Sequence, residues 1–270
     1  MPSKQKRKPW SRIVTKIISV RRRRLILGLG AGAGSLLLGG CDRLSNLPQT
    51  QSVLSSAQWL TRAAQRALVS RDALAPEFTR ADIAPVFRAN GTTDPDNPEY
   101  QTLAKNGFRD WRLRIDGLVE RPKQISLDDI RAMPAQSQIT RHDCVEGWSC
   151  IGQWTGPLLR DVLAQVVPKP QARYVMFFGA DPVDDGSDYY YESIDMRTAV
   201  HPQTLLAYAL NGETLPVAYG APLRLRLGRQ LGYKMAKYVM HIQLVSSYKP
   251  FGQGNGGYWE DQGYTWYAGI

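Results

Sequence analysis

The sequence predicts an α+β domain built from mixed sheets and short helices. Strand-like hydrophobic patterns outnumber helical patterns along the chain, and a strong hairpin signal occurs at Asn211-Gly212. Together these observations favour a mixed α+β arrangement over a doubly wound parallel sheet. At 270 residues the chain is long enough to bury a sizeable core, as one large domain or two small ones.

The basic charge of the protein lies at its N-terminus. Ten of the 34 Lys and Arg residues fall within the first 24 positions, where no acidic residue occurs. The other 24 basic residues balance the 24 Asp and Glu residues, so the formal net charge of +10 belongs to this leader. A general binder of nucleic-acid phosphates carries its excess charge on the folded domain, and the sequence therefore argues against nucleic-acid binding.

The leader has the layout of an export signal with a lipidation site. An apolar run over residues 25–40 follows four arginines and ends at Cys41. At 16 residues it is shorter than the roughly 20 that span a bilayer. The segment LGGC resembles a lipobox, which would be lipidated at Cys41, and RRRRLIL resembles a twin-arginine signal. An uncleaved N-terminal anchor is the alternative.

Both alternatives tether the domain to the periplasmic side of the bacterial inner membrane. Twin-arginine export moves folded proteins, usually because a cofactor is inserted in the cytoplasm, so this signal predicts a bound non-peptide group. We assign residues 1–40 to the signal peptide and residues 41–75 to a tether and an amphipathic helix. The helix is indicated by apolar residues at helical spacing: Val53, Ala57, Leu60, Ala64 and Ala67.

The catalytic domain is expected over residues 76–270. Residues 76–107 are rich in Pro, Asn and Asp and predict an irregular arm, a kind of segment that is often functional. A half-buried strand follows, because Trp111 and the apolar residues after it alternate with polar ones. Ser126 and Asp129 have the spacing of an N-cap pair and predict a short helix.

A second helix is expected from Thr155 through Val166, where Leu and Val recur at helical spacing. Residues 174–178 predict a buried strand. Asn211-Gly212 predicts a hairpin, because both turn positions need positive φ.

Further strands are expected near the end of the chain. Leucines alternate with arginines over residues 223–227, and another strand pattern covers 238–245. The Gly- and aromatic-rich tail, 252–270, is expected to wrap on the domain.

Two of the three cysteines lie in one short stretch, RHDCVEGWSC. As a nucleophile, Cys144 would need a histidine base; His142 is near, but no protease-like motif surrounds the pair. Two cysteines and three scattered histidines also lack the spacing of a zinc site. A disulfide remains possible outside the cytoplasm, and burial without function is the simplest alternative, which we favour for Cys150. The charged flank of Arg141, His142 and Glu146 suits a thiolate ligand at Cys144.

A second candidate site is the basic stretch GAPLRLRLGRQLGYKMAK, residues 220–237. Glycine lets backbone N–H groups approach an anion, while Arg and Lys side chains bind its oxygens. The stretch has neither the glycine pattern of a Walker loop nor that of a dinucleotide-binding motif. A solvated basic strand face and a site for a phosphate-bearing cofactor are the two interpretations.

Both stretches, with HPQTLLAYALNGETLPVAYGAP between them, resemble the sulfite oxidase family of molybdopterin enzymes. Within that family the chain is most similar to the branch of periplasmic methionine sulfoxide reductase catalytic subunits. The resemblance covers about residues 86–270 and rests on the order and spacing of several motifs. It implies the molybdopterin-binding fold of the family, without the C-terminal dimerisation domain of classical sulfite oxidases, and hence a monomer.

The resemblance implies roles for individual residues. Cys144 matches the cysteine whose thiolate ligates molybdenum, a soft ligand suited to this metal. Glu146 and Asn90 match residues that line the metal pocket and complete the implied catalytic set. The implied cofactor-binding residues are Asn90, Arg141, His142, Gly179, His201, Arg224, Gly232, Tyr233, Lys234 and Lys237. Cys150 is not part of the ligand pattern of the family.

The implied activity is two-electron transfer of an oxygen atom to or from a small substrate, at a molybdenum cofactor with one pterin. Reduction of an S- or N-oxide and oxidation of a sulfur compound both fit the motifs. The sequence has no Cys-x-x-Cys-His haem motif, so a separate membrane or periplasmic cytochrome is expected as redox partner. A non-catalytic lipid-anchored binding or assembly module that retained the fold is the alternative. The joint presence of Cys144, Glu146 and Gly232-Tyr233-Lys234 argues against it.

Overall fold

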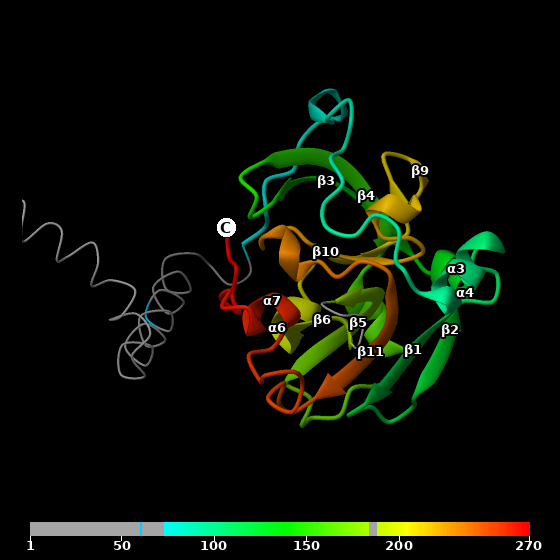
Figure 1. Cartoon of the computed structure of the whole chain (residues 1–270), viewed down its shortest axis with the longest axis vertical. Helices are drawn as coiled ribbons and strands as arrows, with labels where there is room; N and C mark the ends of the chain where they lie inside the picture. Colours follow the sequence, from blue (N-terminus) through cyan, green and yellow to red (C-terminus); the bar gives the residue numbers. More distant parts are fainter. Residues whose placement is uncertain (1–59, 61–72, 184–187) are drawn as a thin grey trace, which may run out of the picture. The chain divides into compact units, whose positions relative to one another are not determined.

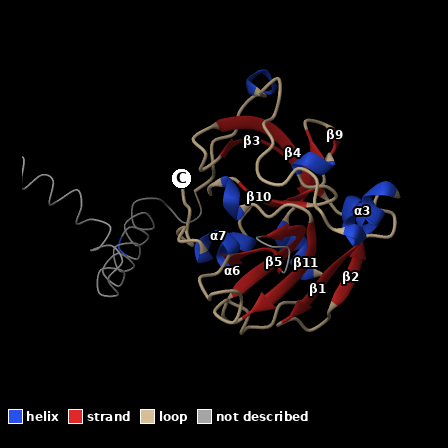
Figure 2. Cartoon of the chain, in the orientation of Figure 1, coloured by secondary structure: helices blue, strands red, loops and turns tan. Residues whose placement is uncertain are grey.

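The structure, a computed structural model, describes residues 60, 73–183 and 188–270. The chain divides into two compact units, Met1–Ala64 and Gln65–Ile270, and all of the described residues except Leu60 belong to the second. Cys41, the signal peptide and, except for Leu60, the amphipathic helix lie outside the described residues. In the second unit short helices connect β-sheets, so the α+β class is confirmed (Figure 1, Figure 2).

A five-stranded mixed sheet is the largest of the described sheets. Its strands, in spatial order, are β2 (Lys123–Ser126), β1 (Arg112–Gly117), β11 (Val239–Val245), β5 (Tyr174–Val183) and β6 (Asp188–Asp195). β1 and β11 run parallel, and the other neighbouring pairs are antiparallel. The predicted alternation in β1 is confirmed, because Leu113 and Ile115 are fully buried while Arg112 and Arg114 are exposed. The strands predicted at 174–178 and 238–245 are confirmed as β5 and β11.

Two smaller sheets complete the described strands. They consist of β3 (Ala135–Asp143), β4 (Ser149–Pro157), β8 (Ala209–Leu210) and β9 (Glu213–Thr214), and of β7 (Thr204–Ala207) with β10 (Arg224–Leu227). β8 and β9 form the predicted hairpin, with φ angles of 53° at Asn211 and 86° at Gly212.

The helices are short. They are η1 (Arg80–Asp82), α3 (Pro98–Lys105), α4 (Leu127–Ala132), α5 (Leu159–Ala164), α6 (Met196–Ala199), η2 (Val217–Tyr219), η3 (Gly232–Lys234) and α7 (Tyr258–Asp261). Ser126 and Asp129 form the predicted capping box of α4. None of the described helices is long and apolar enough to cross a membrane.

Two expectations about helices need correction. The helix predicted from Thr155 begins only after Leu158, because Thr155 pairs with β3 and β8 and prolongs β4. The arm expected to be irregular contains α3, which Asn97 caps by accepting a hydrogen bond from the backbone N–H of Tyr100.

Strand β10 is buried on both faces. Its leucines pack into the main hydrophobic core, together with residues such as Trp111 and Phe177. Its arginines face Trp154, which belongs to a second buried cluster around Phe87. Arg224 and Arg226 are 0% and 2% exposed, so the interpretation of this stretch as a solvated basic strand face is wrong.

Candidate active site

The turn between β3 and β4 carries Cys144. The backbone N–H of Cys144 donates to the carbonyl of Trp148 (2.9 Å), and that of Gly147 donates to the carbonyl of Cys144 (3.1 Å). Gly147 has a φ of 83°, a conformation that favours glycine. Neither Cys144 nor Cys150 forms a disulfide, which excludes that alternative. Cys150 packs in the second hydrophobic cluster as a small core residue.

Cys144 lies on the wall of a cavity of about 100 Å³. The lining residues come from the arm, the β3–β4 turn, the segment after β10 and the C-terminal tail. The structure thereby brings together six of the residues predicted from the sequence: Asn90, Cys144, Glu146, Gly232, Tyr233 and Lys237.

Lys237 fixes the arm at the cavity. Its ammonium donates to the carbonyls of Asn90 (2.8 Å) and Ala218 (3.2 Å), and also to the carbonyl of Thr92. Burial, followed by repulsion from Arg224, lowers the pKa of Lys237 to about 7. Because three carbonyls accept from one ammonium, the loop that carries Asn90 is held in place without a carboxylate.

Arg224 and Arg226 lie buried beside this site without a carboxylate partner among the described residues. Arg224 donates to the carbonyl of Tyr219 (3.1 Å) and approaches Oδ1 of Asn90 (3.5 Å). Both guanidinium groups lie over the ring of Trp154, at 5.2 and 4.4 Å from its centroid. The Nε atoms of both arginines have no hydrogen-bond partner. Two buried positive charges without an ion-pair partner raise the free energy of the folded protein. A bound anionic group would lower it, so the site is suited to such a group.

His142 links the arginines to the Cys144 turn. Its Nδ1 lies 2.7 Å from Nη1 of Arg226, which donates to it. Burial, followed by repulsion from Arg226, holds the pKa of His142 well below its ordinary value, so the imidazole is neutral. A Cβ on Gly232 would lie 2.6 Å from the His142 ring, so η3 can approach this histidine only because residue 232 is glycine.

Glu146 lies at the mouth of the cavity. Its carboxylate accepts a hydrogen bond from Nε1 of Trp148 (2.8 Å) and lies 3.9 Å from Nη2 of Arg88. More than half of the side-chain surface of both Glu146 and Arg88 is exposed. The solvent-facing entrance therefore carries a screened ion pair, which contributes little to stability.

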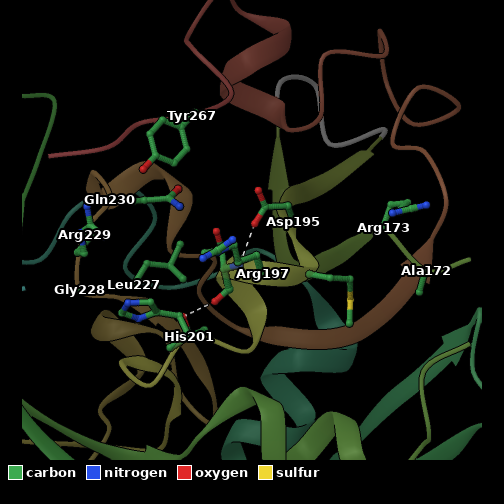
Figure 3. Close-up of a pocket in the computed structure, with 13 residues that line it drawn as sticks. Ala172, Arg173, Asp195, Arg197, His201, Leu227, Gly228, Arg229, Gln230 and Tyr267 are labelled. Atoms are coloured by element: carbon green, nitrogen blue, oxygen red, sulfur yellow. Dashed lines mark hydrogen bonds between the residues drawn. The ribbon is translucent and has the colours of Figure 1, made fainter. Parts of the chain in front are cut away.

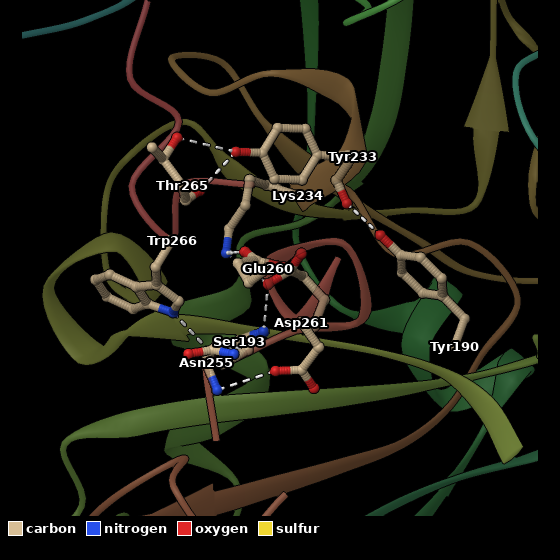
Figure 4. Close-up of polar contacts among 11 residues, drawn as sticks. Tyr190, Ser193, Tyr233, Lys234, Asn255, Glu260, Asp261, Thr265 and Trp266 are labelled. Atoms are coloured by element: carbon tan, nitrogen blue, oxygen red, sulfur yellow. Dashed lines mark hydrogen bonds and ion pairs between the residues drawn. The ribbon is translucent and has the colours of Figure 1, made fainter. Parts of the chain in front are cut away.

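The side chain of Lys234 does not line the cavity. Its ammonium contacts Glu260 (Figure 4). It also lies 2.5 Å from Oε1 of Glu192, and all three side chains are almost completely buried. The structure thus places the charge of Lys234 in a network with β6 and α7. From the sequence, by contrast, Lys234 was predicted to bind a phosphate of the cofactor.

Three other predicted residues also lie away from the cavity wall. Arg141 pairs with Asp143 on the surface of β3. Gly179 borders a different hollow beside His241. His201 lines a separate cavity of about 310 Å³, where Arg197 and Arg229 also lie (Figure 3).

The sequence analysis missed several residues of the site. Arg226 was considered only as part of a basic strand, although an arginine alternating with leucines inside a short strand was a usable signal. Val145 and Met235 lie within the two recognised stretches but were not assigned to the site. Other omissions line the cavity from segments without a recognised motif: Thr92, Asp181, Tyr190 and Trp259.

Residues 100–251 match the family described as the oxidoreductase molybdopterin binding domain. The chain belongs to this family. It is a molybdopterin-dependent oxidoreductase of the sulfite oxidase family, so the resemblance inferred from the sequence is confirmed.

Curated relatives extend the similarity over most of the chain. A putative protein-methionine-sulfoxide reductase subunit YedZ1 of Azospira oryzae is 37% identical over 95% of this chain and 91% of that protein. Protein-methionine-sulfoxide reductase catalytic subunits MsrP of Xanthomonas campestris pv. campestris and Ralstonia nicotianae are 33% and 30% identical. They match 88% and 90% of this chain, and 74% of each relative is covered. The sulfane dehydrogenase SoxCD from Paracoccus pantotrophus is similar over 52% of this chain and 39% of its own, with 24% identity and a TM-score of 0.46.

The residues around the Cys144 cavity fit a molybdopterin. The unpaired Nε atoms of Arg224 and Arg226 offer hydrogen bonds and charge to an anionic group. Burial raises the pKa of the Cys144 thiol, and coordination of a metal ion would instead favour the thiolate. No three His, Cys, Asp or Glu side chains gather as metal ligands within 73–183 and 188–270.

Proposed function

We propose that this protein is the catalytic subunit of an exported methionine sulfoxide reductase, anchored at the periplasmic face of the membrane. The observation that carries the proposal is the free Cys144 thiol on a cavity beside two buried arginines that lack carboxylate partners in the described part of the chain. The similarity to methionine sulfoxide reductase subunits favours reduction of a methionine sulfoxide over oxidation of sulfite or another sulfur compound.

Each site residue has a role in this proposal. Cys144 would ligate molybdenum, and Arg224 with Arg226 would neutralise the negative charge of the pterin group. Asn90, held by Lys237 and close to Arg224, positions the arm against the cofactor. Further contacts to the pterin would come from the backbone of Gly232 and from Tyr233, which also line the cavity.

Reduction of a sulfoxide consumes two electrons and two protons and releases a sulfide and water. The bound cofactor supplies the two-electron redox chemistry. The electrons come from a separate redox subunit, since the sequence carries no Cys-x-x-Cys-His haem motif. Asp181 lines the cavity, and burial raises its pKa to about 6, so it can hold a proton beside the substrate near neutral pH.

The leader supports the cellular placement. A twin-arginine pattern suits an enzyme that receives its cofactor before export, and lipidation of Cys41 would hold the domain near a membrane-bound electron donor. We further propose that the enzyme functions as a single catalytic chain with one pterin.

Molybdenum analysis tests the proposal directly. Protein purified from the membrane fraction of a host that makes the cofactor should contain about one molybdenum per chain. Cys144→Ser should lose the metal and the reduction of methionine sulfoxide by a reduced viologen dye. Cys150→Ser, the matched control, should retain both. Wild-type protein without molybdenum would instead favour a non-catalytic binding module, and molybdenum-loaded protein that oxidises sulfite but reduces no sulfoxide would reverse the direction proposed.

A further inference from the structure

The C-terminal tail supplies an aromatic wall to the cavity that contains Cys144. Trp259, in α7, lines this cavity and is 37% exposed. Val145, the neighbour of Cys144, lines it too and is 44% exposed. Single exposed apolar residues are common on protein surfaces, but two of them on one cavity beside a proposed metal ligand are typical of a ligand site.

The indole of Trp259 is fixed before any substrate arrives. It stacks on Tyr264, with ring centroids 5.2 Å apart and an interplanar angle of 28°. The ring of Tyr258 meets it edge-on at 5.1 Å. Tyr264 in turn packs edge-on against Tyr233, another residue of the cavity, at 5.1 Å. A preformed aromatic surface loses little conformational freedom when it binds a ligand.

The backbone of α7 is anchored directly after its contact with the cavity. Glu260 follows Trp259 directly and binds the ammonium of Lys234 (Figure 4). Glu192 from β6 binds the same ammonium. Asp261 accepts a hydrogen bond from the hydroxyl of Tyr191, also in β6. These buried contacts connect the tail to β6 and η3, so the fold itself determines where the indole lies.

We propose that Trp259 is a specificity-determining residue that binds the carbon substituents of the sulfoxide, the side chain of methionine sulfoxide. This inference rests on the proposed function. A sulfoxide joins one polar S–O bond to two apolar arms, and sulfur with its adjacent carbons makes favourable contacts with aromatic rings. Trp259 and Val145 receive the carbon arms, while the polar part of the cavity beside Cys144, where Asp181 lies, receives the S–O bond. Sulfite has no carbon arm and gains nothing from this wall.

Steady-state kinetics of the molybdenum-loaded enzyme test the inference, with a reduced viologen dye as electron donor. N-acetylmethionine sulfoxide and dimethyl sulfoxide are compared as substrates, because the second presents much less apolar surface. Trp259→Ala should raise KM for N-acetylmethionine sulfoxide about tenfold and leave kcat within about twofold. The same variant should change KM for dimethyl sulfoxide by only about twofold, and Trp259→Phe should restore most of the loss.

Binding measured without turnover gives a second readout. Calorimetric titration with N-acetylmethionine sulfone, which keeps both carbon arms, should show a Kd about tenfold weaker for Trp259→Ala. Tyr189→Ala is the control, because Tyr189 is 45% exposed and does not line the cavity. Molybdenum content and thermal unfolding verify that each variant is folded and loaded.

The outcomes separate the two proposals. If the loaded wild type reduces neither sulfoxide, the proposed function is wrong and this inference fails with it. If the wild type is active and Trp259→Ala keeps its KM and sulfone affinity, only the inference is overturned. Equal losses on both substrates, or Trp259→Phe as impaired as Trp259→Ala, would show a structural role for Trp259 and would also overturn it.

Discussion

Replacing Lys234 with methionine should destabilise the protein even when no cofactor is bound. Lys234 Nζ lies 2.5 Å from Oε1 of Glu192 and also contacts Glu260, and each side chain is at most 1% exposed. Lys234→Met leaves two carboxylates in a dry interior without their shared ammonium. Removing one partner from a buried ion pair costs about 3–5 kcal/mol, and we expect a loss in that range.

The pH dependence of this loss has a definite sign. Burial raises the pKa of Glu192 well above its ordinary value of 4.5, and Lys234 opposes that shift. Without Lys234 the pKa of Glu192 rises further, so the folded variant holds a proton that the unfolded chain releases. Such a group stabilises the fold below the unfolded pKa and loses that contribution as pH rises through the folded pKa. The deficit of Lys234→Met should therefore be smaller at about pH 5 than at about pH 8.

Thermal unfolding of cofactor-free protein, followed by circular dichroism, measures the effect. In a domain of this size each kcal/mol shifts Tm by roughly 2–4 °C, so a fall of about 6–20 °C is expected at about pH 8. Lys249→Met is the control, since Lys249 is exposed. A fall below about 2 °C would refute the ion network as the role of Lys234. A loss confined to cofactor-loaded protein would return Lys234 to the phosphate-binding role predicted from the sequence.

Three further changes probe the buried site. Gly232→Ala places a Cβ about 2.6 Å from the His142 ring. The free energy of unfolding, measured with denaturant, should fall by about 1–3 kcal/mol, and the protein should retain less molybdenum. Unchanged stability would contradict the close packing of Gly232 against His142. Arg226→Met should leave the cofactor-free protein at least as stable as the wild type, while its molybdenum content falls. A less stable variant that keeps its molybdenum would show that Arg226 is purely structural. Burial raises the pKa of Asp181 from 3.8 to about 6. The contribution of this group to wild-type stability should therefore be lost as pH rises from about 4 to about 6. Asn does not titrate, so Asp181→Asn should reduce the stability change across this pH range by roughly 3 kcal/mol, measured by unfolding at several pH values. A pH profile identical to that of the wild type would contradict the raised pKa of Asp181.

Local chemistry determines the features that the sequence predicts well. The Asn211-Gly212 turn needs only positive φ at two adjacent positions, and the capping box of α4 joins residues three apart. The Cys144 motif is similarly compact, because the turn from Cys144 to Trp148 closes on its own backbone. Such features depend on neighbours along the chain and are visible without a tertiary structure.

Long-range packing determines the features that the sequence prediction missed. The burial of Arg226 depends on Trp154, which belongs to β4 and lies far away in the sequence. The partners of Lys234 come from β6 and α7, on either side of it along the chain. His201 precedes the basic stretch by about twenty residues along the chain, yet the fold places it on another cavity. No local pattern encodes any of these three contacts.

The basic stretch after Gly220 therefore divides into groups with different electrostatic partners. Lys234 meets two carboxylates and holds the tail, and Lys237 meets three carbonyls and holds the arm. Arg224 and Arg226 form no ion pair with a carboxylate of the described residues, and their Nε atoms have no hydrogen-bond partner. Because buried charges without compensation are costly, these two cations are the ones that a bound anion would stabilise. Loss of either lysine should consequently loosen a wall of the cavity, whereas loss of either arginine should weaken retention of the cofactor itself.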